Sequence, residues 1–242
     1  MPEGPAILHL RNKLLPFKGK AVTKAGGYGK MPTAWMKGKK LTDISTWGKH
    51  LLFVFGKEVV RIHLGLFGEV VINERKKVNA SFFLHFAQGE INGYIVKAIK
   101  LEESIKETYD YRIDILSDKF DKAYVKSLIK TKADKSVDDV LMDQDIFSGV
   151  GNKIRNESLY LAGIHPLSVT GSIPAAKITK LVNSVVSYAH SFYQQLEKQG
   201  VHDEFYVYKQ DYAKDGSEVT MKVLPKTKRK IYFSEHKQKL YR

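Results

Sequence analysis

The stretch Ser136–Pro166, SVDDVLMDQDIFSGVGNKIRNESLYLAGIHP, decides the fold of the second half of the chain. Ser136 followed three residues later by Asp139 predicts a capped helix start, with an aspartate in place of the usual glutamate. Gly149-Val150-Gly151-Asn152 then predicts a compact turn before a second helix. The backbone N–H groups at the start of that helix are suited to binding phosphate. Asn152 is placed to cap the helix and reach a phosphate oxygen.

Hydrophobic periodicity on either side of this stretch predicts an α+β protein with two domains. Helices are expected at residues 3–15, 121–131 and 175–198. Strands are expected at Lys40–Thr46, Leu51–Phe55, Val59–His63, Val70–Asn73, Ser81–Phe86, Gly93–Ala98, Arg112–Leu116, Phe205–Lys209, Val219–Leu224 and Lys230–Phe233. We therefore expect an antiparallel β-sandwich with a leading helix in residues 1–117. A helical domain is expected in residues 118–242, ending in a β-hairpin finger from about residue 205.

The charge of the chain indicates a polyanionic partner, and nucleic acid before membrane. The 242 residues include 40 lysines and arginines against 26 acidic residues, which gives a net charge of +14. There is no cysteine, so disulfides, zinc–thiolate sites and thiol catalysis are excluded. Neither a signal peptide nor an apolar run of spanning length is visible, and we expect an intracellular, cytoplasmic protein, associated with the nucleoid in a bacterium.

The first residues, Met1-Pro2-Glu3-Gly4-Pro5, carry potential chemistry. Removal of Met1 would expose the ring nitrogen of Pro2 as a secondary amine, which can attack an aldehyde-like carbon and form an iminium ion. An α-amino group titrates at about 7.7–8.0, well below a lysine at about 10.4. Glu3 places a carboxyl group suited to proton transfer beside it. The alternative is an ordinary helix start with proline in its first turn and an acid near the positive end of the dipole.

Several short motifs follow one another along the chain, each occurring once. They are Met1-Pro2-Glu3-Gly4-Pro5, Gly48-Lys49, His63-Leu64-Gly65-Leu66, Asp143-Gln144, Gly149-Val150-Gly151-Asn152, Asn156-Glu157-Ser158-Leu159, Ala162-Gly163-Ile164-His165-Pro166 and Arg229. In this order and spacing the chain resembles the family of formamidopyrimidine-DNA glycosylase and endonuclease VIII. These base-excision-repair enzymes are also abasic-site lyases. The helix–turn–helix stretch would then be the helix–two-turns–helix element of that family.

The resemblance implies a role for each matching residue. Pro2 would be the nucleophile, Glu3 would shuttle protons, and Lys49 would hold a phosphate and assist catalysis. The positions that would grip phosphates around an everted nucleotide are His63, Asn152, Tyr208 and Arg229. Leu66, with Phe67, would fill the gap that the nucleotide leaves in the duplex.

Structural alternatives stand beside these roles. Lys49 could be one of many solvated lysines and His63 a satisfied core histidine. Leu66 and Phe67 could belong to the core, although the glycines on both sides favour a loop tip. Tyr208 lies in an alternating pattern and could be purely structural.

The chain also departs from the family pattern. Many members carry a four-cysteine zinc finger, whereas Asp215, Ser234 and Lys237 stand roughly where thiolates would be. We therefore expect no metal and a zincless finger that still presents Arg229 to DNA. Ala6 replaces a second acid, and Arg112 is a poor match to the arginine that fills the void in many members. The short connection at about residues 199–204 favours oxidised pyrimidines and ring-opened purines over 8-oxoguanine.

The function implied by the resemblance is a bifunctional DNA glycosylase and lyase. It would work without a cofactor, as a monomer, on damaged double-stranded DNA, through a Schiff base at Pro2 and β,δ-elimination. One alternative is a catalytically inactive damaged-DNA-binding or nucleic-acid-binding protein on the same scaffold. Another is a basic protein associated with RNA or the ribosome, which would show no preference for damaged duplex DNA.

Overall fold

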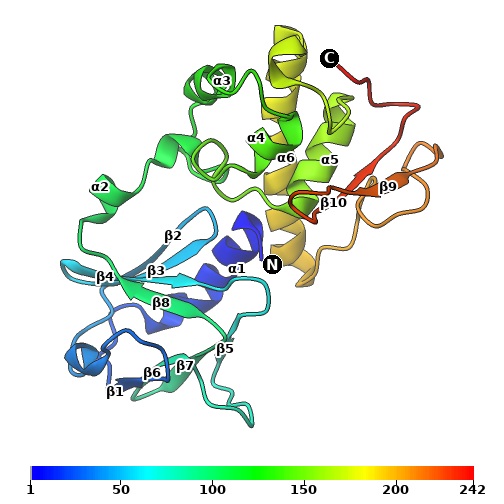
Figure 1. The fold of residues 1–242 in the computed structure, drawn as a ribbon. Helices are drawn as coiled ribbons and strands as arrows, with labels where there is room; N and C mark the ends of the chain where they lie inside the picture. Colours follow the sequence, from blue (N-terminus) through cyan, green and yellow to red (C-terminus); the bar gives the residue numbers. More distant parts are fainter. Residues whose placement is uncertain (1) are drawn as a thin grey trace. The chain divides into compact units, whose positions relative to one another are not determined.

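The computed structural model describes residues 2–242, which fold as two compact units. The first unit ends at Asp110 and the second runs from Tyr111 to Arg242 (Figure 1). Met1, whose removal would free the nitrogen of Pro2, lies outside the described residues. Among the residues described, no helix is both long and apolar enough to cross a membrane.

The first unit is a sandwich of two four-stranded antiparallel sheets, as predicted. One sheet has the order β1-β6-β7-β5 and the other the order β2-β3-β4-β8. The strands are β1 (Lys24–Gly26), β2 (Asp43–Trp47), β3 (His50–Phe55), β4 (Glu58–His63), β5 (Glu69–Ile72), β6 (Phe82–Phe86), β7 (Gly89–Tyr94) and β8 (Lys97–Lys100). Alternate residues of these strands, such as Leu51, Phe53 and Leu84, are buried in one hydrophobic core.

Helix α1 (Gly4–Leu14) leads into the sandwich, and it begins and ends for local reasons. Pro5 occupies the first turn, where a missing N–H costs no hydrogen bond. Ile7 and Leu14 are buried against the core, and the helix contacts β2 and β3. The 3-10 turns η1 (Leu15–Phe17) and η2 (Ala34–Met36) complete the links between these elements. This packing fixes the position of the residues that precede the helix.

Two strand predictions in this part of the chain are wrong. The expected strand Gly93–Ala98 is divided between the end of β7 and the start of β8, because the chain turns at Ile95, which has a φ of 55°. The expected strand Arg112–Leu116 begins instead as the 3-10 turn η3 (Tyr111–Ile113), after the short helix α2 (Ile105–Thr108). Its backbone forms an isolated bridge between Asp114 and Ser148 in place of a strand pairing, and the carbonyl oxygen of Arg112 accepts the N–H of Asp121 at 2.9 Å. The guanidinium of Arg112 lies 3.8 Å from the ring centre of Tyr124.

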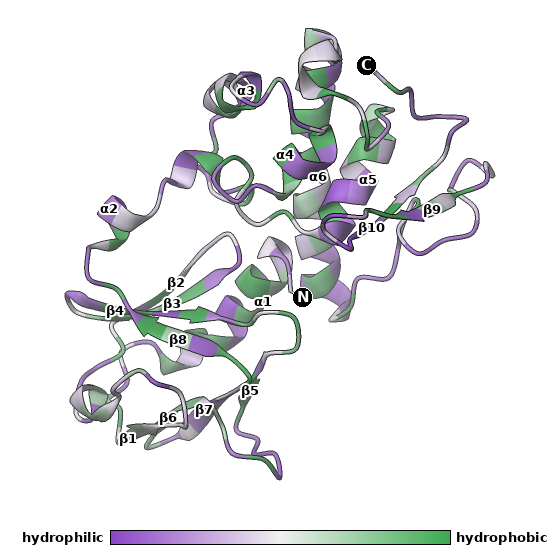
Figure 2. Ribbon diagram, viewed as in Figure 1, coloured by the Kyte–Doolittle hydropathy of each residue, from purple (hydrophilic) through white to green (hydrophobic). Residues whose placement is uncertain are grey.

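The second unit is helical, as predicted. Its elements are α3 (Lys122–Lys130), α4 (Val137–Met142), α5 (Asn152–Ala162), the 3-10 turn η4 (Thr170–Ser172) and α6 (Ala175–Gln199). The carboxylate of Asp121 caps α3 by accepting the N–H groups of Ala123 and Tyr124. Ser136 caps α4 as predicted, since its Oγ accepts the N–H of Asp139 at 3.2 Å, and its hydroxyl also donates to the carboxylate of Asp139 at 2.9 Å. Along these helices hydrophobic and polar segments alternate (Figure 2), and the apolar residues face one another in the core.

The finger at the end of the second unit is a two-stranded antiparallel hairpin, β9 (Thr220–Val223) and β10 (Lys230–Phe233). The strand expected at Phe205–Lys209 is wrong: this segment bends and turns. Its N–H groups at residues 206, 207 and 208 all donate to the buried carboxylate of Glu157, which draws them to one point. A strand would direct successive N–H groups to opposite sides.

Candidate functional site

Pro2 and Glu3 lie directly before helix α1. Glu3 is the N-cap residue of that helix, and its carbonyl oxygen accepts the N–H groups of Ala6 at 2.9 Å and Ile7 at 3.2 Å. The Glu3 residue is only 4% exposed, whereas Pro2 is half-buried. The start of the helix therefore holds a carboxyl group in a buried position next to Pro2.

Lys49 lies in the turn between β2 and β3, after Gly48, which has a φ of 51° that favours glycine. The residue is 8% exposed, and burial lowers the pKa of its ammonium group, while attraction to the Glu3 carboxylate acts in the opposite direction. The structure thus brings Lys49 within the electrostatic influence of Glu3, although 46 positions separate them in the sequence. A buried ammonium group with a lowered pKa gives up a proton more readily than a surface lysine.

Two histidines and two aromatic rings pack together beside the turn that carries Lys49. His50 pairs with His63 in the sheet register, and their ring centres lie 5.5 Å apart. Trp47 packs 4.9 Å from Tyr109 and 5.6 Å from His50. Burial lowers the pKa of His50 to about 4 and also lowers that of His63, where the charge of Lys49 adds to the effect. Both imidazoles are therefore neutral at pH 7.

His63 is half-buried, so it is neither a core residue nor fully exposed. Its Nδ1 is buried and has no hydrogen-bond partner within residues 2–242. The predicted phosphate-gripping role of His63 stays a prediction.

Leu66 and Phe67 lie at the tip of the turn between β4 and β5. They are 60% and 75% exposed, so they are not core residues. The turn is tight, since a Cβ on Gly68 would come within 2.0 Å of the carbonyl oxygen of Leu64. Two large apolar side chains held in solvent by a tight turn are typical of a surface that binds a partner.

In the second unit, Asn152 is the first residue of α5 and follows the N-cap residue Gly151. Its Oδ1 is buried and unpartnered within the described chain. The preceding turn is fixed by Gln144, whose amide donates to the carbonyl oxygen of Val150 at 3.0 Å and accepts the N–H of Gly149 at 3.2 Å. The sequence motif thus forms the predicted turn at a helix N-terminus. The prediction that Asn152 caps this helix is wrong, because the N-cap residue is Gly151 and no side chain caps the first turn.

The backbone of Tyr208 is held by Glu157. The Oε1 of Glu157 accepts the N–H of Tyr208 at 2.7 Å and that of Val207 at 3.0 Å, and its Oε2 accepts the N–H of Tyr206 at 2.7 Å. The Tyr208 ring lies 5.3 Å from the ring of Tyr232, on the finger. The turn that carries Tyr208 is therefore anchored to α5 and also contacts the hairpin.

Arg229, just before β10, forms ion pairs with two carboxylates. Its Nη2 lies 3.1 Å from Asp138 and also contacts Asp139, at the start of α4. Asp138 is fully buried and pairs in addition with the buried Arg155 at 3.1 Å. Arg155 in turn donates to the carbonyl oxygen of Lys230 at 2.7 Å. A phosphate at Arg229 would therefore share the guanidinium with two carboxylates.

Three consecutive residues of α5, to which the sequence had suggested no role, hold the finger and the turn before it. Arg155 supports Arg229 through Asp138, Glu157 supports Tyr208, and the Oδ1 of Asn156 accepts the N–H of Tyr232 at 2.9 Å. The signal in the sequence is a run of polar residues, Arg155-Asn156-Glu157, on a helix whose neighbours Ile154 and Leu159 are core residues.

The finger, for which we expect no metal, holds a cluster of polar side chains. Asp215 accepts the N–H and hydroxyl of Ser217 at 3.1 and 2.6 Å, and it lies 3.6 Å from the ammonium group of Lys237. The hydroxyl of Ser234 donates to that of Ser217 at 2.8 Å. In residues 2–242 no group of three or more histidine, cysteine or acidic residues could hold a metal ion. The finger cluster Asp215, Ser217, Ser234 and Lys237 thus joins the ends of the hairpin by hydrogen bonds.

Comparison with known proteins gives matches over both units. Residues 1–95 match the N-terminal domain of formamidopyrimidine-DNA glycosylase, and residues 113–195 match the H2TH domain of formamidopyrimidine-DNA glycosylase. The chain is 27% identical over 208 residues to Endonuclease 8-like 3 of Mus musculus, covering 82% of this chain and 34% of that protein. It is 33% identical over 172 residues to Endonuclease 8-like 2 of Homo sapiens, covering 66% of this chain and 50% of that protein. The chain thus spans only a third to a half of these relatives.

Solved structures share the fold. A viral DNA glycosylase has a TM-score of 0.83 and 17% identity, with 98% of this chain and 100% of that chain covered. Formamidopyrimidine-DNA glycosylase of Lactococcus lactis, bound to DNA that contains an abasic site, has a TM-score of 0.84 and 20% identity, with 98% and 99% covered. At this identity the likeness establishes the sandwich, the helical unit and the hairpin as one known fold.

Proposed function

The chain belongs to the family of formamidopyrimidine-DNA glycosylase and endonuclease VIII, and on that premise we propose that it is a bifunctional DNA glycosylase and abasic-site lyase of base excision repair. The observation that carries the proposal is the coupling of buried Glu3 with buried Lys49, beside Pro2. A purely structural helix start would not require a carboxyl group and an ammonium group buried together at its end.

The proposed reaction starts at the nitrogen of Pro2, once Pro2 is the first residue. Its lone pair attacks C1′ of the nucleotide sugar, and the glycosidic bond breaks with its electron pair leaving on the base, which takes up a proton. The nitrogen then loses its own proton and forms a C=N iminium bond as the bond from C1′ to the ring oxygen opens. Glu3 supplies the proton that the ring oxygen takes up.

The iminium ion then acts as the electron sink for strand cleavage. Removal of a proton from C2′ sends its electron pair toward the iminium, and the C3′–O bond breaks to release the 3′ phosphate. A second elimination releases the 5′ phosphate. Lys49, with its lowered pKa, is our candidate for holding a phosphate and taking part in these proton transfers. No external oxidant or reductant is needed.

Damaged double-stranded DNA is the proposed partner, in keeping with the net charge of +14 and the abasic DNA bound by the Lactococcus lactis relative. We propose His63, Asn152, Tyr208 and Arg229 as phosphate contacts. Leu66 and Phe67, the exposed turn between β4 and β5, are the proposed wedge. The short connection after α6, which ends at Gln199, supports a preference for oxidised pyrimidines and ring-opened purines.

The test is reductive trapping with borohydride on duplex DNA that contains one abasic site. Intact-mass measurement first establishes that Met1 is absent, and a covalent adduct is then expected. Insertion of one serine between Met1 and Pro2 turns the proline nitrogen into an amide, and we expect it to reduce trapping at least 100-fold. Lys57→Ala, at an exposed turn, is the matched control and should trap like the wild type.

The same experiment separates the proposal from the alternative of a non-catalytic DNA-binding protein. If Met1-free protein binds the abasic duplex tightly but gives no adduct, the enzyme proposal is wrong and the binding function stands. If it binds undamaged RNA as well as damaged duplex in competition, the RNA-associated alternative is favoured instead.

A further inference from the structure

A groove on the second unit, separate from the proposed DNA-binding residues, lies between α3, η4 and the start of α6. Its volume is about 530 Å³. The floor is apolar, and Ile129, Ile173 and Ile178 line it together with small residues such as Ala133. None of the residues assigned above to catalysis or DNA binding lines it. We call it the α3–α6 groove.

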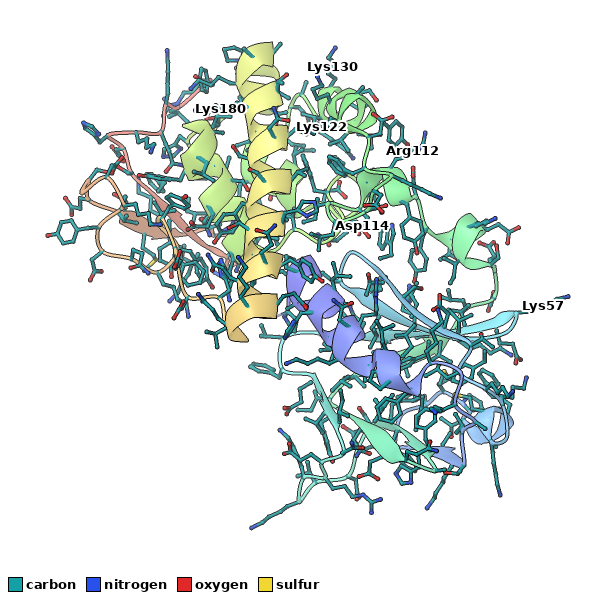
Figure 3. The ribbon with its side chains drawn as sticks, turned by 180° about the vertical axis from the view of Figure 1, so that it is seen from behind. Lys57, Arg112, Asp114, Lys122, Lys130 and Lys180 are labelled. Atoms are coloured by element: carbon teal, nitrogen blue, oxygen red, sulfur yellow. The ribbon has the colours of Figure 1, made fainter. Side chains whose placement is uncertain are left out.

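Two lysines line this groove, and two more line the hollow next to it. Lys126 and Lys130 line it from α3, and a second hollow that shares Thr179 with it is lined by Lys122 and Lys180. Figure 3 shows Lys122 and Lys130 on α3 and Lys180 on α6, two helices that pack against each other. A positive rim thus follows an apolar floor.

The four ammonium groups have no acidic partner of their own within residues 2–242. Nearby lysines do: Lys135 pairs with Asp134 at 3.1 Å and Lys132 with Asp143 at 3.9 Å. The other nearby acid, Asp121, is occupied in capping α3. The groove therefore has positive charge left to offer a ligand.

Lysines beside an apolar floor favour a ligand that carries both negative charge and apolar groups. A phosphodiester backbone would use the lysines but would gain nothing from a floor of isoleucines, because phosphate contacts are electrostatic. A neutral apolar segment would gain nothing from the lysines. A helical segment with apolar residues on one face and carboxylates beside them satisfies both. We propose that the α3–α6 groove docks an acidic amphipathic segment of a partner protein.

The experiment selects 16-residue peptides from a displayed random library on the full chain, with excess undamaged duplex DNA present to occupy the DNA-binding residues. The expected consensus has apolar residues at helical spacing with aspartate or glutamate between them. The best peptide is then labelled with fluorescein and its affinity is measured by anisotropy. Lys126→Glu combined with Lys130→Glu should weaken binding at least tenfold, and so should Thr179→Trp, which fills the groove.

Lys57→Glu is the matched control, because it reverses an exposed lysine in the first unit and should change peptide affinity less than twofold. Circular dichroism verifies that the variants are folded. The proposal is overturned if the selected peptides lack acidic residues, or if their binding ignores the variants. It is also overturned if the double lysine variant leaves peptide binding intact and weakens the binding of undamaged duplex tenfold, which would assign the groove to DNA.

Discussion

Glu157→Gln tests whether one buried carboxylate holds the turn that carries Tyr208. Glutamine has nearly the shape of glutamate, but one of its two terminal atoms is an NH₂ group that cannot accept a hydrogen bond. The two oxygens of Glu157 accept three N–H groups at 2.7, 3.0 and 2.7 Å. At least one of these three donors must therefore lose its acceptor in the variant, and the other two lose a charged one.

The expected magnitude follows from the burial of the site. A hydrogen bond to a charged group contributes about 1.5–3 kcal/mol, and a buried donor left without an acceptor costs about 1–3 kcal/mol. These figures partly describe the same loss, so we expect the free energy for opening this turn to fall by about 2–4 kcal/mol. At about 1.4 kcal/mol for each factor of ten, amide exchange at residues 206–208 should be about 30- to 700-fold faster.

The assay is hydrogen–deuterium exchange of the peptide that spans residues 203–212. The matched control is Glu204→Gln, which removes the same charge from an exposed side chain in the adjoining loop and should leave exchange nearly unchanged. Unchanged exchange in Glu157→Gln would refute the conclusion that this carboxylate anchors the turn. If Tyr208 also contacts DNA, the variant should bind abasic duplex more weakly than the control does.

Three further predictions address charges in the two units. In protein methylated with ¹³C-formaldehyde, the Lys49 resonance should titrate below the usual range of a lysine, and Glu3→Gln should lower its midpoint further, since the Glu3 charge raises the pKa of Lys49. Burial lowers the pKa of His202 to about 4, so the unfolding free energy should fall as the pH drops from about 6.5 to 4, by up to about 3 kcal/mol. His202→Gln should remove this contribution in denaturation followed by circular dichroism, while the contribution of buried His50 over the same pH range remains. Asp215→Asn should loosen the finger, seen as faster exchange in the hairpin, because it removes the charge that Ser217 and Lys237 contact.

The parts of the fold that sequence predicts well are those that local chemistry determines. Ser136 and Asp121 cap their helices within three residues, and the short apolar runs of β3 and β4, rich in Val, Ile and Phe, identify strands that pair with each other. The errors occur where a distant partner decides. Phe205–Lys209 alternates like a strand, but its N–H groups bond to Glu157, about fifty positions earlier. Nothing in the segment itself encodes that partner.

For the candidate site too, residue types could be predicted from the sequence, whereas features that depend on distant packing could not. Pro2, Glu3 and Lys49 were identified by their motifs, and their chemistry could be anticipated from residue type. Their burial could not, because it depends on how α1 packs beside the turn after β2. The lowered pKa of Lys49 follows from that burial. Arg155 and Glu157 were assigned no role, since a charged residue in a helix is usually solvated and only the packing places these two inside.

The finger shows what replaces a metal when the cysteines are absent. A structural zinc ion contributes about 10–16 kcal/mol to the folding of a small module, whereas a hydrogen bond such as the one between the hydroxyls of Ser217 and Ser234 contributes about 1 kcal/mol. The finger cluster alone is therefore too weak to fold the hairpin. The larger contribution must come from the buried contacts with α5, where Asn156 binds the backbone of β10 and Arg155 binds the carbonyl of Lys230. The hairpin is consequently an extension of the helical unit, and the position of Arg229 depends on α4 and α5 through Asp138.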